Sequence, residues 1–242
     1  MFDILFMQIF IQRITSYFIN IINLFFFNNL ESFSNSSHIK HLMKAFRADD
    51  YGHESNTNTG DIGYGWIHYG LIRQQKPNRV LCIGSRHGYI PAILAQACKD
   101  NGFGRVDFVD AGYDLDDAGG WTGEGYWKTL AGKNSFINFG LGNFISLFVM
   151  TNSDFINKYQ SNYYDYIYID GDHSLKGIIL DFKLFWPKLN KNGYMLFHDV
   201  CVKGIKPEGV YGVWKFWELL KKRVSGIEIS FLGSGLGIIQ KK

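Results

Sequence analysis

Short apolar runs alternate along the chain with longer segments whose apolar residues recur at helical spacing, most clearly from Tyr164 to Val200. Tyr164–Asp170 is rich in β-branched and aromatic residues, which predicts a strand that ends in an acidic residue. A helix is predicted next, from apolar side chains at Leu175, Ile178, Ile179, Phe182, Phe185 and Leu189. Asn192-Gly193 indicates a turn, and Tyr194–Phe197 predicts a second strand, which His198 and Asp199 follow.

A strand, a crossover helix and a second strand imply parallel pairing, with the helix on one face of the sheet. Both strands then finish at the same edge, where Asp170, Asp172, His198 and Asp199 lie. Neighbouring strands are about 4.8 Å apart, so Asp170 and Asp199 come close enough to share one cation. Ligands bind at this carboxyl edge in open α/β sheets, and we therefore predict the functional site there.

The same alternation predicts elements on either side of this stretch. Further strands are expected at Arg79–Ile83, Arg105–Val109 and Phe144–Met150, and helices at Ile39–Phe46, Ile62–Gln75, Tyr89–Lys99, Tyr126–Phe139, 151–159 and Val213–Arg223. Asp61 and Ser153 are expected to cap two of these helices. Gly233-Ser234-Gly235 separates the apolar runs Ile227–Phe231 and Leu236–Gln240, which predicts a closing antiparallel hairpin. The whole pattern indicates an α/β domain.

Residues 2–27 are strongly apolar, but polar residues interrupt them about every four positions, which predicts a helix with a narrow polar stripe. A membrane span needs roughly 20 nearly unbroken apolar residues. A secretory signal is not expected, because no basic region precedes the stretch and no small-residue cleavage site follows it. Three interpretations stay open: packing on the domain or on a second subunit, lying in a membrane interface, or spanning a membrane. Residues 28–37 form a polar linker, so we divide the chain into an N-terminal segment, 1–37, and one domain, 38–242.

Composition, net charge and cysteine content indicate the size of the domain, its partners and its location. The 242 residues are 46% hydrophobic, which suits one α/β domain with a full core plus an extension. A net charge of +3 without a long basic run gives no reason to expect a nucleic-acid partner. The three cysteines lack metal-ligand spacing, and we expect Cys82 and Cys98 to be buried free thiols. This favours a reducing, cytoplasmic location, with membrane association through the N-terminal helix left open.

A glycine turn links the strand at 79–83 to the helix that follows it. Gly84 allows the tight turn, Gly88 allows close packing of the helix, and the free N–H groups at the helix start face a ligand. Asp110 ends the next strand and can accept hydrogen bonds from both hydroxyls of a ribose, unless it only caps the following loop. That loop, 111–125, is long, glycine-rich and acidic, and we expect it to act as a lid over a site.

These features follow one another in a recognisable order: a strand with a glycine turn, a strand ending in acid, a strand, a strand with IDGDH, a strand with HD, and a hairpin. From about Gly60 to Gln240 this order resembles the class I S-adenosylmethionine (SAM)-dependent methyltransferases. Within them, the chain looks most similar to the group of macrocin-type sugar O-methyltransferases and cephalosporin hydroxylase relatives. The shared segments are RVLCIGSRHG (79–88), VDFVD (106–110), YDYIYIDGDHSLKGIILDFKLFWPKLNKNGYMLFHD (164–199) and GVWKFWELL (212–220). The resemblance implies a Rossmann-like α/β sandwich with a seven-stranded, mostly parallel sheet and a C-terminal antiparallel hairpin.

The resemblance also implies roles for individual residues. Those expected to bind SAM are Gly84, Ser85, Gly88, Asp110, Asn152, Ser153 and Asp170. Mg²⁺ or another divalent ion would be held by Asp170, His198 and Asp199, and Asp172 or His173 would act as the general base. The chain departs from the family pattern at Cys82, where an acidic residue is usual, and at Arg86, which replaces the middle glycine of the turn. In addition, His198 stands where the metal-dependent sugar enzymes carry a carboxylate.

The expected function is therefore SAM-dependent O-methylation of a small-molecule or sugar hydroxyl. The protein would mainly align the acceptor with an already activated methyl group, while a base and a divalent ion help the hydroxyl to lose its proton. An oxygen-rich site would favour Mg²⁺, whereas a His198 ligand would favour a transition metal. Two other functions stay open: an oxidoreductase on the same type of fold, and a non-catalytic or membrane-associated binding protein. Simpler interpretations also stand for two residues, because Asp172 could only cap a helix and His198 could only hydrogen-bond the sheet edge.

Overall fold

The computed structural model describes residues 36–50, 52–113, 125–206, 209–230 and 233–242. The helix predicted at 2–27 and most of the lid predicted at 111–125 lie outside these residues. The first described helix, α2 (Ser36–Ala45), includes the last two residues of the predicted linker. Within the described part of the chain, no helix is long and apolar enough to cross a membrane.

The strands of the main sheet are arranged in the order β3 (Ile145–Val149), β2 (Arg105–Asp110), β1 (Arg79–Ile83), β4 (Tyr164–Ile169), β5 (Leu189–His198), β9 (Leu236–Gln240) and β8 (Gly226–Ile229). The first five pair in parallel. The last two form an antiparallel hairpin, and β9 also pairs antiparallel with β5. The predicted seven-stranded, mostly parallel sheet with its C-terminal hairpin is therefore confirmed for the described residues.

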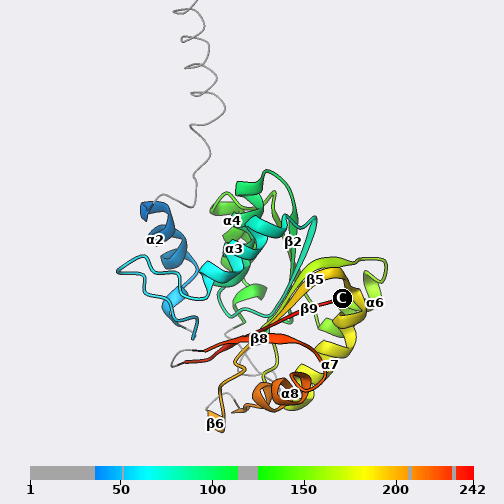
Figure 1. Ribbon diagram of the computed structural model, residues 1–242. Helices are drawn as coiled ribbons and strands as arrows, with labels where there is room; N and C mark the ends of the chain where they lie inside the picture. The colour runs from blue at the N-terminus through cyan, green and yellow to red at the C-terminus, as the bar shows by residue number, and fades with distance from the viewer. Residues whose placement is uncertain (1–35, 51, 114–124, 207–208, 231–232) are drawn as a thin grey trace, which may run out of the picture.

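Each face of the sheet buries its own hydrophobic core, because side chains along a strand alternate between the faces. On β4, Tyr166 and Tyr168 pack into one core, and Ile167 and Ile169 into the other. The first core also takes residues of α2, α3 (Gly65–Gln75), α4 (Tyr89–Asn101) and α5 (Leu130–Asn138). The second takes residues of α6 (Asn152–Lys158), α7 (Leu175–Phe185) and α8 (Val213–Leu220). The result is a three-layer α/β sandwich, seen in Figure 1 with α3 and α4 on one side of the sheet and α7 and α8 on the other.

Two predicted helix caps are wrong. Thr151, not Ser153, caps α6: its backbone is extended, and its side chain accepts a hydrogen bond from the Asp154 N–H. Ser153 lies inside the first turn, where its backbone is already helical. Asp61 instead stabilises the turn before α3, because its Oδ1 accepts from the Gly63 N–H at 3.0 Å. Serine or threonine caps of this kind contribute about 1 kcal/mol each.

Two elements differ from the prediction in more than their end residues. The helix expected at Tyr126–Phe139 is interrupted at Thr129, whose extended backbone separates a 3₁₀ turn (Tyr126–Lys128) from α5 and caps α5. Strand β5 starts at Leu189, so the predicted Asn192-Gly193 turn lies inside the strand. Asn192 has a φ of +66°, and the pairing of β5 with β4 shifts register there, which is the behaviour of a bulge. All three cysteines are free, and Cys82 and Cys98 are buried as expected.

The order of the strands reverses between β1 and β4, and ligands bind at such a switch point in open α/β sheets. The chain leaves β1 through Gly84, which has a φ of +72°. A Cβ at this position would lie 2.3 Å from the carbonyl oxygen of Asp170, just beyond β4. Gly84 therefore allows the ends of these two strands to come together at the switch point.

Candidate active site

Two cavities adjoin at the carboxyl edge of the sheet. The smaller cavity has a volume of about 280 Å³ and lies over the ends of β1, β2 and β4. The larger cavity, of about 620 Å³, lies beside it and is closed by the loop around His53 and by the end of the β8–β9 hairpin. Ser85, Arg86, Asp170 and His173 line both cavities. A ligand in one cavity would therefore face a ligand in the other across a shared wall.

The smaller cavity collects most of the residues predicted to bind a cofactor: Gly84, Ser85, Asp110, Asn152, Ser153 and Asp170. The Asp110 carboxylate accepts hydrogen bonds from the backbone N–H groups of Gly112 at 2.7 Å and Ser85 at 3.2 Å. Burial raises the pKa of Asp110 to about 6. The two N–H donors fix the carboxylate in position, and its remaining lone pairs can accept hydrogen bonds from a ligand.

Gly88 is not among the residues that line the smaller cavity. It has a φ of +86° at the start of α4, and a Cβ there would lie 2.7 Å from the Trp127 ring. Its local role is to allow this packing. The Ser85 side chain accepts a hydrogen bond from the Gly88 N–H at 3.0 Å, so its hydroxyl oxygen holds the turn together.

Asp181 is a residue of the smaller cavity that the sequence analysis missed. It lies on α7 and is buried, and its Oδ1 accepts a hydrogen bond from the Asn152 side-chain amide at 2.6 Å. Burial raises its pKa to about 7. The signal was present in the sequence, because Asp181 occupies the apolar face of α7 between Ile178 and Phe185.

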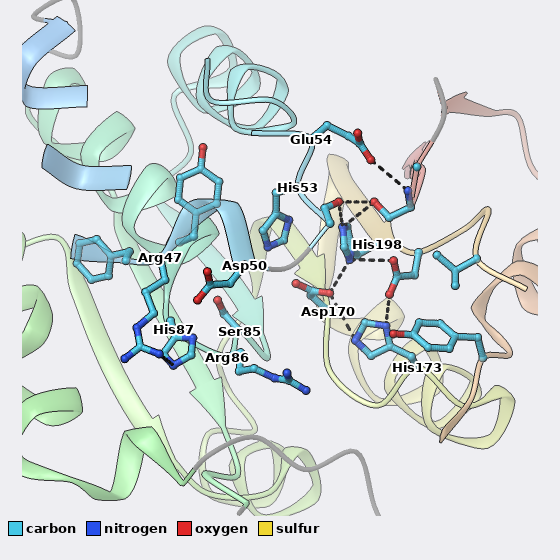
Figure 2. Close-up of a pocket in the computed structure, with 18 of the residues that line it drawn as sticks. Arg47, Asp50, His53, Glu54, Ser85, Arg86, His87, Asp170, His173 and His198 are labelled. Carbon is cyan, nitrogen blue, oxygen red and sulfur yellow. Dashed lines mark hydrogen bonds and ion pairs between the residues drawn. The ribbon is translucent and has the colours of Figure 1, made fainter. Parts of the chain in front are cut away.

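The larger cavity contains a cluster of two carboxylates and three histidines, Asp170, Asp199, His53, His173 and His198 (Figure 2). His198 Nδ1 lies 3.0 Å from Asp170 Oδ1 and 3.4 Å from Asp199 Oδ1. His173 forms a short ion pair through Nδ1 with Asp199 Oδ2, and its Nε2 lies 3.6 Å from Asp170 Oδ1. The three residues predicted to hold a metal, Asp170, His198 and Asp199, are thus neighbours in space.

Parallel pairing of β4 with β5 explains this arrangement. Ile169 and Phe197 are paired, so Asp170 and His198, one residue further along, leave the sheet side by side. Asp199 has a φ of +58°, a left-handed conformation that is uncommon outside glycine. Strained backbone of this kind is concentrated at functional sites.

The charges within the cluster influence one another. Burial favours the neutral forms, but the two carboxylates outweigh it for His198 and raise the pKa of that imidazole well above its usual value. Burial likewise lowers the pKa of His173, but the hydrogen bond that His173 donates to Asp199 and the charge of that carboxylate outweigh this, and the pKa is raised. The histidines in turn lower the pKa of both Asp170 and Asp199 against the effect of burial. His53 is the exception, because burial and the nearby His198 lower its pKa to about 4.

The two candidates for the general base have different positions. Asp172 is exposed, lines only the smaller cavity, and accepts a hydrogen bond from the Ser174 N–H at 2.8 Å in the turn before α7. Ser174 itself caps α7. His173 lines both cavities and is oriented by Asp199. This geometry favours His173 for proton transfer.

His53 is the main residue of the cluster that the sequence analysis missed. It lies in the segment 47–60, between the helices predicted at Ile39–Phe46 and Ile62–Gln75, where no element or site residue was expected. Its side chain is buried and its ring centroid lies 4.7 Å from that of His198. No spacing pattern in the sequence indicates that His53 lies near His198, because the two residues belong to segments far apart in the chain.

The rest of the larger cavity comes from the loop at 47–60, the segment after β5 and the glycine turn. Its lining is mixed in charge and partly aromatic, with Arg47, Asp50, Glu54, Arg86, Lys203, Tyr89 and Tyr211 among its residues. Arg47 also approaches His87, with 3.1 Å between Nη1 and Nε2. A cavity with this lining suits a polar, hydroxylated molecule.

The fold is that of the class I SAM-dependent methyltransferases. Residues 81–200 match the model of a family described as a methyltransferase domain. An O-methyltransferase from Bacillus cereus in complex with SAH is 16% identical, with a TM-score of 0.62 over 87% of this chain and 93% of that one. An O-methyltransferase from Streptomyces achromogenes involved in tomaymycin synthesis, in complex with SAM, is also 16% identical, with a TM-score of 0.56 over 91% and 96% of the chains.

A third similar structure is an SAH-bound methyltransferase from Podospora anserina, 17% identical, with a TM-score of 0.59 over 96% of this chain and 94% of that one. A comparison with curated protein sequences found no significant match. At these identities the solved structures bear on the fold, and the chemistry of this chain has to be argued from its own residues.

Proposed function

We propose that the protein is a SAM-dependent methyltransferase that transfers a methyl group to a hydroxyl of a small molecule or sugar. The observation that carries the proposal is the pair of cavities with a common wall at Asp170 and His173. A donor in the smaller cavity and an acceptor in the larger one would meet at that wall. We also propose that, among the methyltransferases of this fold, the protein is most similar to the macrocin-type sugar O-methyltransferases.

The residues of the smaller cavity fit SAM. Asp110 ends β2 and presents a carboxylate, already oriented by two backbone N–H groups, that can accept hydrogen bonds from both ribose hydroxyls. Asn152 and Ser153 would lie near the adenine, with Asp181 holding the Asn152 amide in position. Gly84 and Ser85 would line the ribose and methionine part, and Asp170 would lie at the junction with the larger cavity. SAM supplies a methyl group that is already activated by its sulfonium charge.

On the acceptor side, the chain must orient a hydroxyl and remove its proton. We assign the base to His173, because its ion pair with Asp199 fixes the ring in the wall between the cavities. A carboxylate that orients a histidine and stabilises its protonated form is a recurring arrangement in proton transfer. Asp170, His198 and Asp199 would hold a divalent ion, which would lower the pKa of an acceptor hydroxyl.

Calorimetric titration of the purified protein with SAM and with its product, S-adenosylhomocysteine (SAH), tests the proposal. We expect micromolar dissociation constants for both. The same protein, incubated with methyl-labelled SAM and a panel of hydroxylated small molecules and sugars, should transfer the label to an oxygen. Absence of SAM and SAH binding at millimolar concentration would exclude the proposal, and preference for a nicotinamide cofactor would favour an oxidoreductase.

A further inference from the structure

His53 is a buried histidine with an unsatisfied nitrogen. The residue is 5% exposed, and its Nδ1 has no hydrogen-bond partner among the described residues. Leaving such a group unpaired in a buried position is destabilising, so a partner bound in the cavity is the simplest physical explanation. Figure 2 shows the ring directed toward His198 and Asp170.

The loop that carries His53 is fixed in position. The His53 carbonyl accepts a hydrogen bond from the Tyr64 N–H at 2.9 Å. The preceding Gly52 carbonyl accepts one from the Ser234 hydroxyl, and His198 Nε2 lies 3.2 Å from it. The loop is therefore tied both to the start of α3 and to the sheet edge, and His53 does not reach the cluster by chance rotation of a free loop.

The surroundings of His198 determine where a cation would lie. Because the Gly52 carbonyl can only accept, His198 Nε2 carries the hydrogen. The opposite nitrogen, Nδ1, then faces oxygens of both Asp170 and Asp199, at 3.0 and 3.4 Å. A lone pair cannot point at two carboxylates without a positive charge between them, so this position requires a proton or a metal ion. A backbone carbonyl that fixes the tautomer of a histidine is the usual outer partner of a metal ligand.

The spacing fits one ion. One ligand atom from each of His53, Asp170 and His198 can be chosen so that all three lie within 4.8 Å of one another. Ligands bound at about 2.1 Å to a single ion lie roughly 3.0 to 4.2 Å apart, so small side-chain rotations close the site. His173, His198 and Asp199 meet the same criterion. We do not include His173, because its Nδ1 already pairs with Asp199.

We propose that His53, His198 and Asp170, with Asp199 beside them, form a binding site for a divalent transition-metal ion such as Zn²⁺ rather than for Mg²⁺. Mg²⁺ prefers oxygen ligands and retains several waters, whereas imidazole nitrogens favour Zn²⁺, Fe²⁺, Co²⁺ and Ni²⁺. Two histidines and a carboxylate in one buried cluster therefore do not match the oxygen-rich site that the family resemblance implies. The proposal deepens the proposed function but does not depend on methyl transfer.

The test uses full-length protein without a histidine tag, stripped of metal with a chelator. We expect one equivalent of Co²⁺ to give visible absorption bands typical of nitrogen coordination, Zn²⁺ to displace it, and millimolar Mg²⁺ to leave the bands unchanged. Displacement of Co²⁺ by millimolar Mg²⁺, or absence of stoichiometric Co²⁺ and Zn²⁺ binding, would overturn the proposal.

Two histidine variants decide whether His53 is a ligand. Loss of an outer partner of a metal ligand lowers metal affinity about ten- to a hundredfold. Loss of a direct ligand should cost more, so His53→Ala should weaken Co²⁺ binding at least a hundredfold. His87→Ala is the matched control, since His87 is also a buried histidine of the larger cavity but lies outside both candidate groups. Its metal affinity should stay within about threefold of the wild-type value. Equal affinities of the two variants would overturn the role of His53.

Two further measurements keep the outcomes distinct. Thermal unfolding of each variant shows whether it is folded. If His53→Ala does not fold, His53→Asn is used in its place. SAH titration of the same preparations separates this proposal from the methyltransferase assignment. SAH binding without metal binding would overturn only the metal site, whereas metal binding without SAH binding would support the site and contradict the proposed function.

Discussion

Replacing Gly84 by alanine tests whether the closeness of β1 and β4 at the switch point is needed for stability and for the site. Gly84 has a φ of +72°, and an added Cβ would lie 2.3 Å from the Asp170 carbonyl oxygen and 2.6 Å from the Gly171 Cα. Ordinary contacts of a Cβ lie at 3.4–4 Å. The backbone around Asp170 would therefore have to move by about 1 Å, an overlap of the kind that overpacking produces.

The chain offers a matched control at Gly102, which ends α4. It has a similar φ of +76°, but nothing lies within 4 Å of an added Cβ. Alanine at a left-handed position costs about 1–2 kcal/mol, partly offset by the lower entropy of the unfolded chain, so Gly102→Ala should lower the free energy of unfolding by about 1 kcal/mol. Gly84→Ala adds an overpacking cost of about 1–3 kcal/mol, for a total of about 2–4 kcal/mol.

Urea unfolding followed by circular dichroism measures both variants, with linear extrapolation to water. SAH titration of the folded proteins should show at least tenfold weaker binding for Gly84→Ala and unchanged binding for Gly102→Ala, because only Gly84 touches the Asp170 backbone. Equal losses of stability in the two variants would refute the reasoning, since the overlap would then contribute nothing.

Four other outcomes are expected from the structure. Asp110→Asn should weaken SAH binding about ten- to a hundredfold in calorimetry, because hydrogen bonds to a charged group are worth about 1.5–3 kcal/mol; unchanged affinity would contradict the ribose assignment. Burial raises the pKa of Asp110 to about 6, so its carboxylate is charged above this pH and becomes neutral below it. SAH binding should accordingly weaken from pH 7 to pH 5 in the wild-type protein, and a variant Asp110→Asn with the same pH dependence would exclude this cause. Tyr164→Phe should lower the free energy of unfolding by about 1–2 kcal/mol in urea titrations, because the buried Tyr164 hydroxyl donates to Asp107 at 3.0 Å, and a loss below about 0.3 kcal/mol would contradict that contribution. A chain that starts at Ser36 should keep the SAH affinity of the full-length protein if 38–242 is an independent domain, and loss of binding would contradict that division.

The sequence predicted the parts of the site that follow from the topology of the sheet. Asp170, His198 and Asp199 come at the ends of strands joined by a crossover helix, and parallel pairing brings such ends together whatever the side chains are. The same argument placed Gly84 and Asp110 at the edge of the sheet.

The parts that depend on loop conformation could not be predicted. His53 reaches the cluster through hydrogen bonds of Gly52 with Ser234 and His198, contacts across much of the chain that no local pattern encodes. Asp172 and His173 are adjacent in sequence, and their positions depend on the turn before α7. In this turn Asp172 accepts a hydrogen bond from the Ser174 N–H, whereas His173 lines both cavities. The mistaken cap at Ser153 has a similar cause, because the backbone becomes helical one residue after Thr151.

The position of β9 affects when the site can form during synthesis. This strand follows all the other described strands in sequence, yet it lies between β5 and β8 in the sheet. Ser234, just before it, joins the Gly52 carbonyl to His198. A nascent chain that still lacks residues 233–240 would therefore have an open edge at β5 and no Ser234 beside His198. The larger cavity can be complete only after residues 233–240 have been synthesised, because Gly233 and Ser234 form part of its lining.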